Sequence, residues 1–386
     1  MADDRPRAAF DHWRLLAAIV LPALILVAVQ LRGADHPTAA KLDDVELHAM
    51  AAPVQPRTIT VALTGEILPH PSVVEHARRF GAASGRPFDF APMFADVRRL
   101  VRRADLAICH LEVPVAPPGT PLSGYPVFAI PPEVADGIRA TGWDRCSTAS
   151  NHSNDQGTAG IRATIDALAG AGVGHSGTAR TRKEAAAPSI VDVDGIRVAH
   201  LAATAGFNGI PPDEPWMADL IDLHRILADA RRAREAGADL VIVSLHWGIE
   251  YDSAGDVHQR RLAKTLLDSR DVDLIVGHGP HVLQPIERFH RKYALLSVGN
   301  LVANQGRERP STYDGVVATV TFTQRPDGRF RAAPPVVEPT WYDGTTGHVW
   351  RVRTALKDPS AAPLRPELRA SLQRTRAVLG PYVPRR

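Results

Sequence analysis

Five short apolar runs in this chain each end in carboxylate, imidazole or amide side chains, and this repetition constrains the fold more than any other feature. Apolar runs of roughly four to eight residues bounded by turn residues are typical of buried strands. The carboxyl ends of parallel strands meet at one edge of a sheet, where side chains face a crevice. We therefore expect the polar clusters to converge. They are Gly65-Glu66, His110-Leu111-Glu112, Asn151-His152 with Asp155, His246 with Glu250, and His278 with His281.

Strand and helix patterns alternate in the first half of the folded region, and strand patterns dominate the last third. Alternating units form parallel sheets with covering helices, whereas consecutive strands form antiparallel sheets. We therefore expect an α/β chain that continues into antiparallel β, in the α+β sense. The expected helices span 71–80, 92–103, 134–141, 158–171, 223–236, 257–269 and 366–379, and the expected strands span 59–63, 105–111, 144–149, 174–176, 190–193, 197–202, 240–245, 274–276, 282–289, 293–298, 315–323 and 330–338.

The side chains at these strand ends predict a metal site. Carboxylates, imidazoles and one amide in a single crevice suit divalent ions of the zinc, manganese or iron kind. Two such ions about 3.5–4 Å apart can hold an oxyanion and lower the pKa of a bridging water. His152 would then be free to protonate a leaving oxygen. The expected cofactor is a pair of divalent ions, and the lack of thiolates near the other candidates argues against a structural zinc site.

Each cluster also has a plainer explanation. An Asn or Asp at a strand-to-helix turn caps the following helix, and Glu112 could cap the turn after its strand. His246 alone is more often a hydrogen-bonded core histidine than a ligand. The segment 278–281 is more specific, because its glycine and proline exclude a regular helix and hold two imidazoles on a tight loop. The recurrence of such clusters at five strand ends favours a shared site.

The charge distribution argues against a nucleic-acid partner. The 386 residues have a formal net charge of only +3, and the arginine pairs lie at spacings typical of the solvated faces of helices. A nucleic-acid binder instead gathers basic residues with aromatic ones on one surface. We therefore expect no nucleic acid among the partners of this protein.

The two cysteines, Cys109 and Cys146, each lie near the end of an expected strand. Neither belongs to a CxxC or zinc-ribbon spacing. Buried free thiols are the default expectation. A disulfide between neighbouring strands is the alternative, in an oxidising compartment.

The segment from Leu15 to Leu31 is apolar except for Gln30. As a helix it would be about 26 Å long, slightly shorter than a hydrocarbon core of ~30 Å. It could be a signal-peptide core, a membrane anchor or a buried helix, and the missing small-residue cleavage site favours an uncleaved anchor. We therefore expect a single-pass protein of the cell membrane, with its main domain outside the cytoplasm. The expected parts are a cytoplasmic N-terminus over 1–14, a transmembrane signal anchor over 15–32, a linker over 33–57, a folded domain over 58–345 and a C-terminal tail with a helix over 346–386.

Six motifs occur in an order that resembles the CapA/PgsA family of bacterial capsule (poly-γ-glutamate) synthesis proteins, over roughly residues 58–340. The resemblance implies a calcineurin-like metallophosphoesterase fold, a β-sandwich flanked by helices. It also implies a membrane-anchored protein that faces outward. The motifs are Thr64-Gly65-Glu66, His110-Leu111-Glu112-Val113-Pro114, Asn151-His152-x-x-Asp155-x-Gly157, His246-Trp247-Gly248-x-Glu250-Tyr251, Gly277-His278-x-Pro280-His281-Val282-Leu283-Gln284-Pro285 and Ser297-x-Gly299-Asn300.

The resemblance also implies roles for individual residues. His152 would be the proton donor, and Asp155 would orient it. The chain departs from the family at two places, because Glu66 stands where the family usually has Asp and His110 stands where it usually has Asn. A longer carboxylate moves a metal by roughly one methylene, and His110, like Glu250, could add to or replace a ligand. The ligands implied by position are Glu66, Glu112, Asn151, His246, His278 and His281.

These expectations combine into a function. The chain is expected to be a metal-dependent, hydrolase-like protein that serves an anionic extracellular polymer or its precursor, acting on a phosphoester or an amide linkage with a metal-activated water. The alternative is a non-catalytic scaffold or binding component of a polymer synthesis or export complex, which the changed Gly-Glu motif and the anchor support. A third hypothesis, a soluble cytosolic phosphatase, requires the segment from Leu15 to Leu31 to be core.

Overall fold

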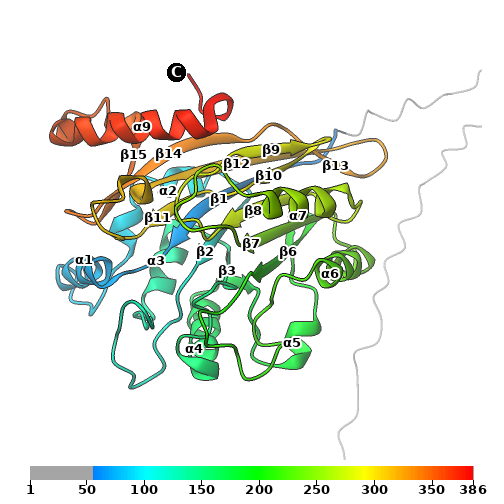
Figure 1. Ribbon diagram of the computed structural model, residues 1–386, viewed down its shortest axis with the longest axis horizontal. Coiled ribbons are helices and arrows are strands. Elements are labelled where there is room, and N and C mark those ends of the chain that lie inside the picture. Colours follow the sequence, from blue (N-terminus) through cyan, green and yellow to red (C-terminus); the bar gives the residue numbers. More distant parts are fainter. Residues whose placement is uncertain (1–54, 386) are drawn as a thin grey trace, which may run out of the picture. The chain divides into compact units, whose positions relative to one another are not determined.

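Two β-sheets pack face to face in the computed structural model, which describes residues 55–385 (Figure 1). The expected cytoplasmic segment 1–14, the expected anchor 15–32 and nearly all of the linker 33–57 lie outside the described residues. Within residues 55–385, no helix has both the length and the hydropathy that crossing a membrane requires.

The first sheet has the strand order β15-β14-β12-β1-β2-β3-β4, with β11 beside β1 and β13 beside β12. Its strands β1 to β4 are parallel, and β12, β14 and β15 are antiparallel to their neighbours. The strands are β1 (Thr58–Ile67), β2 (Leu106–Leu111), β3 (Arg145–Ser147), β4 (Gly174–Ser176), β11 (Asn300–Val302), β12 (Asp314–Gln324), β13 (Phe330–Ala332), β14 (Val336–Asp343) and β15 (His348–Arg351).

The second sheet has the order β5-β6-β7-β8-β10-β9, in which β6, β7, β8 and β10 are parallel. Its inner face packs against the inner face of the first sheet, and Val61, Ile108, Ile242 and Val276 from the two sheets share one buried apolar cluster. The strands are β5 (Ile190–Val193), β6 (Ile196–Thr204), β7 (Leu240–His246), β8 (Leu274–His278), β9 (Ile286–Phe289) and β10 (Lys292–Leu295).

Helices cover both outer faces of the sandwich. Side chains of α1, α3 and α4 share a buried cluster with the outward-facing residues of β1 and β2, and those of α6 and α7 do the same for β7 and β8. Helix α9 lies along β12 and β14 (Figure 1). The expected mixed α/β fold is therefore confirmed, with a β-sandwich flanked by helices. The helices are α1 (Pro71–Ala82), α2 (Arg98–Val101), α3 (Val134–Thr141), α4 (Gly157–Gly170), α5 (Arg182–Ala186), α6 (Leu223–Glu235), α7 (Val257–Asp268), α8 (Val352–Ala355) and α9 (Arg365–Leu379), with 3₁₀ turns at Ala91–Phe94, Pro310–Tyr313, Pro359–Leu364 and Gly380–Tyr382.

Two sequence-based expectations about the elements were wrong. The segment expected as a helix over 92–103 is a 3₁₀ turn followed by the single turn of α2. The backbone departs from a regular helix because Met93, Phe94 and Val97 are all fully buried in the core. The strand expected over 330–338 is divided into β13 and β14. Consecutive prolines at 334–335 separate them, since proline cannot donate a ladder hydrogen bond.

The expectation of free thiols was also wrong, and the alternative is correct. Cys109 in β2 and Cys146 in β3 face each other in the parallel register, with their Cα atoms 4.4 Å apart, and form a disulfide. Both residues are buried under the helices of the first sheet. The sequence could not decide this point, because the register between two strands is a tertiary property.

Candidate metal centre

The expected site lies where the parallel strands of both sheets end. In the first sheet, Glu66 pairs in register with His110, and His110 pairs with Ser147. In the second sheet, His246 pairs with His278. The two rows meet across the sandwich, where Nε2 of His110 lies 3.1 Å from Nδ1 of His246. The topology thus brings five strand ends to one edge.

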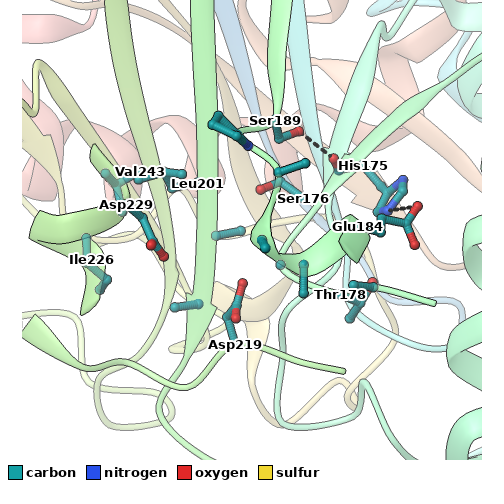
Figure 2. Close-up of a pocket in the computed structure, with 18 of the residues that line it drawn as sticks. His175, Ser176, Thr178, Glu184, Ser189, Leu201, Asp219, Ile226, Asp229 and Val243 are labelled. Carbon is teal, nitrogen blue, oxygen red and sulfur yellow. Dashed lines mark hydrogen bonds and ion pairs between the residues drawn. The ribbon is translucent and has the colours of Figure 1, made fainter. Parts of the chain in front are cut away.

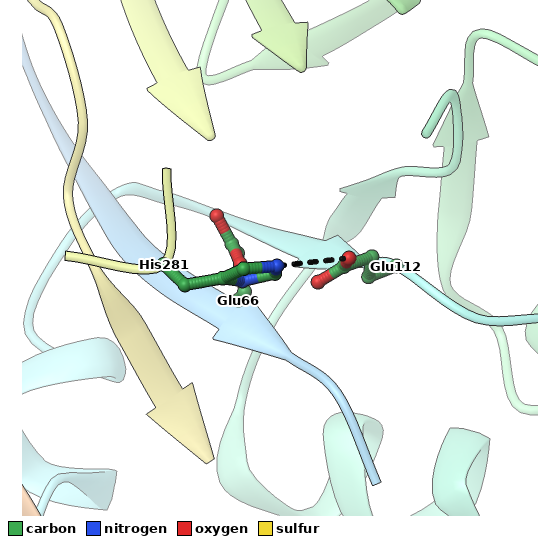
Figure 3. Close-up of side chains that lie close together, drawn as sticks. All are labelled: Glu66, Glu112 and His281. Atoms are coloured by element: carbon green, nitrogen blue, oxygen red, sulfur yellow. Dashed lines mark hydrogen bonds and ion pairs between the residues drawn. The ribbon is translucent and has the colours of Figure 1, made fainter. Parts of the chain in front are cut away.

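Three residues form the group that we call the acidic triad: Glu66, Glu112 and His281 (Figure 3). One candidate ligand atom from each lies within 4.8 Å of the others, and all three side chains are buried. His281 bridges the two carboxylates, because its Nδ1 bonds to Oε2 of Glu66 and its Nε2 lies 3.8 Å from Oε1 of Glu112. Carboxylate oxygens and an imidazole at this spacing are suited to a divalent cation.

Local backbone features position the triad. The register between β1 and β2 shifts between Leu63 and Glu66, which turns the Glu66 side chain into the crevice. Gly65 permits this shift, because a Cβ at that position would lie 2.4 Å from the carbonyl oxygen of Gly299. His281 adopts a left-handed conformation with φ of 59° after Gly279 and Pro280. The tight loop expected over 278–281 is what directs this imidazole at Glu66.

Charges within the triad control its protonation. Burial alone would raise the pKa of Glu66, but the charge of His281 and its hydrogen bond hold that pKa well below the usual range. Burial lowers the pKa of His281, and the charges of Glu66 and Glu112 outweigh this and raise it to about 10. Burial raises the pKa of Glu112 well above its usual value, and the charge of His281 offsets only part of this rise. Without a cation, the triad is an ion pair beside a carboxyl group that resists ionisation.

Several buried polar atoms at this edge lack a hydrogen-bond partner among the described residues. They are both carboxylate oxygens of Glu112, Oδ1 of Asn151 and Nδ1 of His278. Buried polar atoms in native proteins are nearly always paired, and each orphan costs about 1–3 kcal/mol. A bound cation would accept electron pairs from such atoms and remove that cost. The donor set therefore fits a divalent metal ion.

The remaining imidazoles form a second group, which we call the imidazole cluster: His110, His246 and His278. The ring of His110 stacks on that of His278 with centroids 4.2 Å apart. Its Nδ1 lies 2.8 Å from Oγ of Ser147, and its Nε2 is hydrogen-bonded to His246. Burial lowers the pKa of all three, that of His278 to about 3. The cluster is neutral at physiological pH, as metal binding by imidazole requires.

His152 and Asp155 form a separate pair beside these groups. Nδ1 of His152 lies 2.7 Å from Oδ2 of Asp155, which also accepts a hydrogen bond from the backbone of Phe128. The Phe128 ring packs edge-on against the imidazole at 4.8 Å. Nε2 of His152 lies 3.4 Å from Nδ2 of Asn208. The ring is thus fixed with Nδ1 on the carboxylate and Nε2 towards the crevice.

The structure distributes the expected ligands unevenly. Glu66, Glu112 and His281 come together, whereas His246 and His278 lie in the imidazole cluster with His110. Asn151 donates to Asn208 at 3.3 Å and leaves its carbonyl oxygen without a partner among residues 55–385. Glu250 is exposed and lies outside the acidic triad. Which of these residues bind metal remains a prediction.

Sequence reasoning missed two residues of the site. Oδ1 of Asn300 lies 3.3 Å from Nδ1 of His281, and its amide nitrogen is held by Gln305 and Thr312. The motif Ser297-x-Gly299-Asn300 contained the signal, but no role was attached to it. Asn208, which contacts both Asn151 and His152, lies in a loop without any motif. No local pattern could have identified it.

Comparison with known proteins supplies the family. The family of the bacterial capsule synthesis protein PGA_cap matches residues 60–305, which include all the residues of both groups. The chain belongs to this family. The resemblance seen in the motifs is therefore confirmed.

Three relatives illustrate the membership. The chain is 29% identical over 310 residues to the capsule biosynthesis protein CapA of Bacillus anthracis, across 76% of this chain and 69% of that protein. It is 31% identical over 199 residues to the PGA biosynthesis protein CapA of Bacillus subtilis. That match covers 49% of this chain and 49% of the relative, so the chain spans about half of the relative's length. It is 26% identical over 290 residues to a probable polyglutamine synthesis accessory protein of Mycobacterium tuberculosis, across 64% of this chain and 75% of that one.

Solved structures show more distant likenesses. The NAD nucleotidase of Haemophilus influenzae matches with a TM-score of 0.47 and 10% identity, across 86% of this chain and 64% of that one. The calcineurin-like phosphoesterase YfkN of Bacillus subtilis matches with a TM-score of 0.43 and 13% identity, across 82% of this chain and 99% of that one. Both scores are below 0.5, and the assignment to the family rests on the sequence match.

Proposed function

We propose that this protein is a metal-dependent hydrolase that serves the synthesis of an anionic capsule polymer of the poly-γ-glutamate type. The observation that carries the proposal is the set of orphaned, buried acceptor atoms beside the acidic triad. A fold gains nothing from an unpaired buried carboxylate, so the arrangement is explained if a cation completes it. The family membership supplies the connection with capsule synthesis.

Glu66, Glu112 and His281 would hold one divalent ion, because their candidate ligand atoms already lie together. The unpaired atoms of Asn151 and His278, with the neutral imidazole of His246, would serve a second. Such ions supply a nucleophile from water at neutral pH and stabilise charge on an oxyanion. Zinc, manganese and iron all suit a mixed carboxylate and imidazole set.

His152 would transfer the proton that the reaction requires. Asp155 accepts from Nδ1 and stabilises the positive charge of a protonated imidazole, which leaves Nε2 as the nitrogen that exchanges a proton. The backbone N–H of Phe128 fixes the carboxylate, and the Phe128 ring restricts rotation of the imidazole. A buried histidine oriented in this way is suited to protonate a leaving oxygen.

The proposal includes a location and partners. The apolar segment 15–32 would anchor the protein in the cell membrane with residues 58–345 outside the cytoplasm. Relatives whose printed names refer to capsule, PGA or polyglutamine synthesis support a role as an accessory subunit of a polymer synthesis complex. The substrate would be the anionic polymer or its precursor, cleaved at a phosphoester or an amide linkage.

Metal analysis combined with hydrolysis of a generic phosphodiester tests the proposal. The purified protein is expected to retain a divalent metal and to cleave bis(p-nitrophenyl) phosphate. His152→Ala is expected to lower kcat by ~10²–10⁴-fold with its metal content unchanged. Glu250→Gln changes an exposed carboxylate of the same edge and should retain activity, whereas a loss of metal in this variant would show that Glu250 is itself a ligand. A protein with neither bound metal nor turnover would eliminate the hydrolase.

One observation favours a second candidate, a non-catalytic component of the polymer synthesis complex. Both carboxylate oxygens of Glu66 already have partners, one on the backbone N–H of Gly279 and one on His281. If the hydrogen bonds within the protein already satisfy both oxygens of Glu66, this residue needs no metal ion. Polymer yield in cells that carry His152→Ala separates the candidates, because a scaffold retains its yield and a hydrolase loses it.

A further inference from the structure

A cavity of about 380 Å³ lies away from the metal centre, between the edge strand β4, strand β6 and helices α5 and α6 (Figure 2). Asp229 and Ile226 of α6 lie on one side of it, and His175 and Glu184 lie on the other. Its volume is near the lower end of the ~300–1,000 Å³ typical of small-molecule sites. The charged groups on its wall determine what it can bind.

The carboxylates on the wall are already neutralised by arginines. Asp219 pairs with Arg225. Asp229 pairs with Arg232, and Glu184 pairs with Arg180 at 2.7 Å. These pairs cancel, so they leave no net negative charge that would attract a cation.

Arg145 is the exception among the charged groups that line the cavity. Its side chain is 5% exposed, and no carboxylate of the described residues lies within 4.0 Å of its guanidinium group. Its hydrogen bonds go to neutral groups, with Nε donating to Nδ1 of His200 at 3.3 Å and Nη2 donating to Ser189 and to the carbonyl oxygen of His175. Within residues 55–385, Nη1 has no hydrogen-bond partner. The cavity therefore contains one buried positive charge that forms no ion pair within 4.0 Å, and the charge of Asp144 acts on it only from a greater distance.

The surroundings of Arg145 hold that charge in place. Nε2 of His200 lies 2.8 Å from Oγ of Ser244, and its Nδ1 accepts from Arg145, so this imidazole is neutral and cannot act as the counter-ion. Burial lowers the pKa of Arg145 to about 10, and the charge of Asp144 offsets only part of this fall, so the group is still charged at neutral pH. Burying a charge is costly unless it is paired. An anion in the cavity would remove this cost.

We propose that the cavity binds the carboxylate group of a small organic anion, with Arg145 as its counter-ion. A guanidinium group pairs with planar carboxylates through parallel hydrogen bonds. A singly charged group balances the one guanidinium that forms no ion pair, whereas a doubly charged phosphate would leave one negative charge uncompensated in the cavity. The volume suits an amino acid or a dipeptide. The site is separate from the acidic triad, so its failure would leave the proposed hydrolase untouched.

Isothermal titration calorimetry of the full-length protein, in a buffer free of other small anions, tests this inference. The probes are L-glutamate, γ-glutamylglutamate and inorganic phosphate. At least one of the two carboxylate probes is expected to bind, and phosphate is expected to bind more weakly than that probe. A preference for the dipeptide would indicate the end of a polymer chain as the natural ligand, and a preference for glutamate would indicate the free amino acid. Binding of neither carboxylate probe, or tighter binding of phosphate, would overturn the proposal.

A matched pair of variants at the mouth of the cavity locates the binding. Ala186, the last residue of α5, is exposed and lines the cavity. Ala186→Glu adds a negative charge there and should weaken carboxylate binding by about fivefold, whereas Ala186→Gln has nearly the same size and should change it by less than about twofold. Arg145→Gln should abolish binding. If that variant fails to fold, the pair at Ala186 decides alone, and equal affinities in the pair would place the ligand elsewhere.

Discussion

The acidic triad and the imidazole cluster lie at the same edge of the same sandwich, yet their polar atoms are satisfied to different degrees. In the imidazole cluster, His110 uses both ring nitrogens in hydrogen bonds, to Ser147 and to His246, and stacks on His278. In the acidic triad, Glu112 has no hydrogen-bond partner for either oxygen among the described residues. Among the described residues, the cluster leaves one buried atom without a partner, Nδ1 of His278, and the triad leaves both carboxylate oxygens of Glu112.

The contrast shows where a ligand is needed. Stacked neutral rings stabilise the closed edge of the sandwich whether or not an ion is bound. A carboxyl group whose pKa is raised by burial stores an unfavourable energy that a cation releases. The triad therefore has the features of a binding site, and the cluster has features of both a ligand set and a structural core. The following predictions test this difference.

Glu112→Gln should have the largest effect. It removes the anionic oxygens that lack partners, so the affinity for a divalent metal should fall by at least about 100-fold. The melting temperature of the metal-free protein should change little, because burial disfavours the ionised form of Glu112 and neither of its oxygens has a hydrogen-bond partner among the described residues. The loss of its pairing with His281 at 3.8 Å offsets part of the relief. Calorimetric metal titration and thermal unfolding in a chelator measure the two effects.

The control for this substitution is Glu250→Gln, which changes an exposed carboxylate at the same edge. It should leave metal affinity within about threefold of wild type, since a solvated carboxylate contributes little. A loss of stability in metal-free Glu112→Gln would show that Glu112 has a structural partner, and the contrast between the two groups would disappear.

The free energy of unfolding of the metal-free protein should fall at both alkaline and acidic pH. The acidic triad causes the alkaline fall, and the imidazole cluster contributes to the acidic fall. The pKa of His281 is raised from 6.5 to about 10 by the charges of Glu66 and Glu112 despite its burial, so its contribution is fully present below pH 6.5 and is lost as the pH rises towards 10. The pKa of His278 is lowered by burial from 6.5 to about 3, so stability is lost as the pH falls from 6.5 towards 3. Between pH 4 and 9 each side should amount to a change on the order of 3 kcal/mol.

Denaturant unfolding of the metal-free protein between pH 4 and 9 measures both sides. His281→Gln should flatten the alkaline side. His278→Gln should reduce the acidic side without removing it, because burial also lowers the pKa of His110 and of His246. If His278→Gln altered the alkaline side, the two groups would titrate as one unit, and the division into triad and cluster would be wrong.

His110→Asn should have the smallest effect on metal binding and a moderate one on stability. The substitution removes the stacking on His278 and the hydrogen bond to His246, which should lower the free energy of unfolding by about 1–2 kcal/mol. Metal affinity should stay within about tenfold of wild type, because His110 lies outside the acidic triad. Urea unfolding and metal titration give both values, and a 100-fold loss of affinity would show that His110 is itself a ligand.

The sequence predicted much of the fold because strand and helix periods are local. Helix α3 and strand β4 have the expected bounds, and α1, α4, α6, α7 and α9 begin or end within two residues of expectation. The two failures have different causes: the prolines at 334–335, which divide the strand expected over 330–338, are local, whereas the cause at 92–103 is tertiary. The segment 92–103 has a helical stripe, but Met93, Phe94 and Val97 are packed by surrounding elements that no local window contains.

The candidate site was predicted as a set of residues and not as an arrangement. Polar residues at strand ends identified Glu66, Glu112 and His281, since parallel strands present their carboxyl ends at one edge. Nothing local separated the exposed Glu250 from the buried Glu112, although both follow apolar strands. Exposure is decided by what packs over each residue.

The sequence by itself determined that strands alternate with helices and that reactive side chains follow the strands, because backbone propensity and hydrophobic period act over a few residues. Only the tertiary structure decided which side chains meet. His110 and His246 are 136 positions apart, and Glu66 and His281 are 215 apart. The partners of such residues and the surroundings of Arg145 depend on how the two sheets pack, and the disulfide between Cys109 and Cys146 depends on the register of β2 and β3. Both are the sum of many weak contacts distributed over the chain.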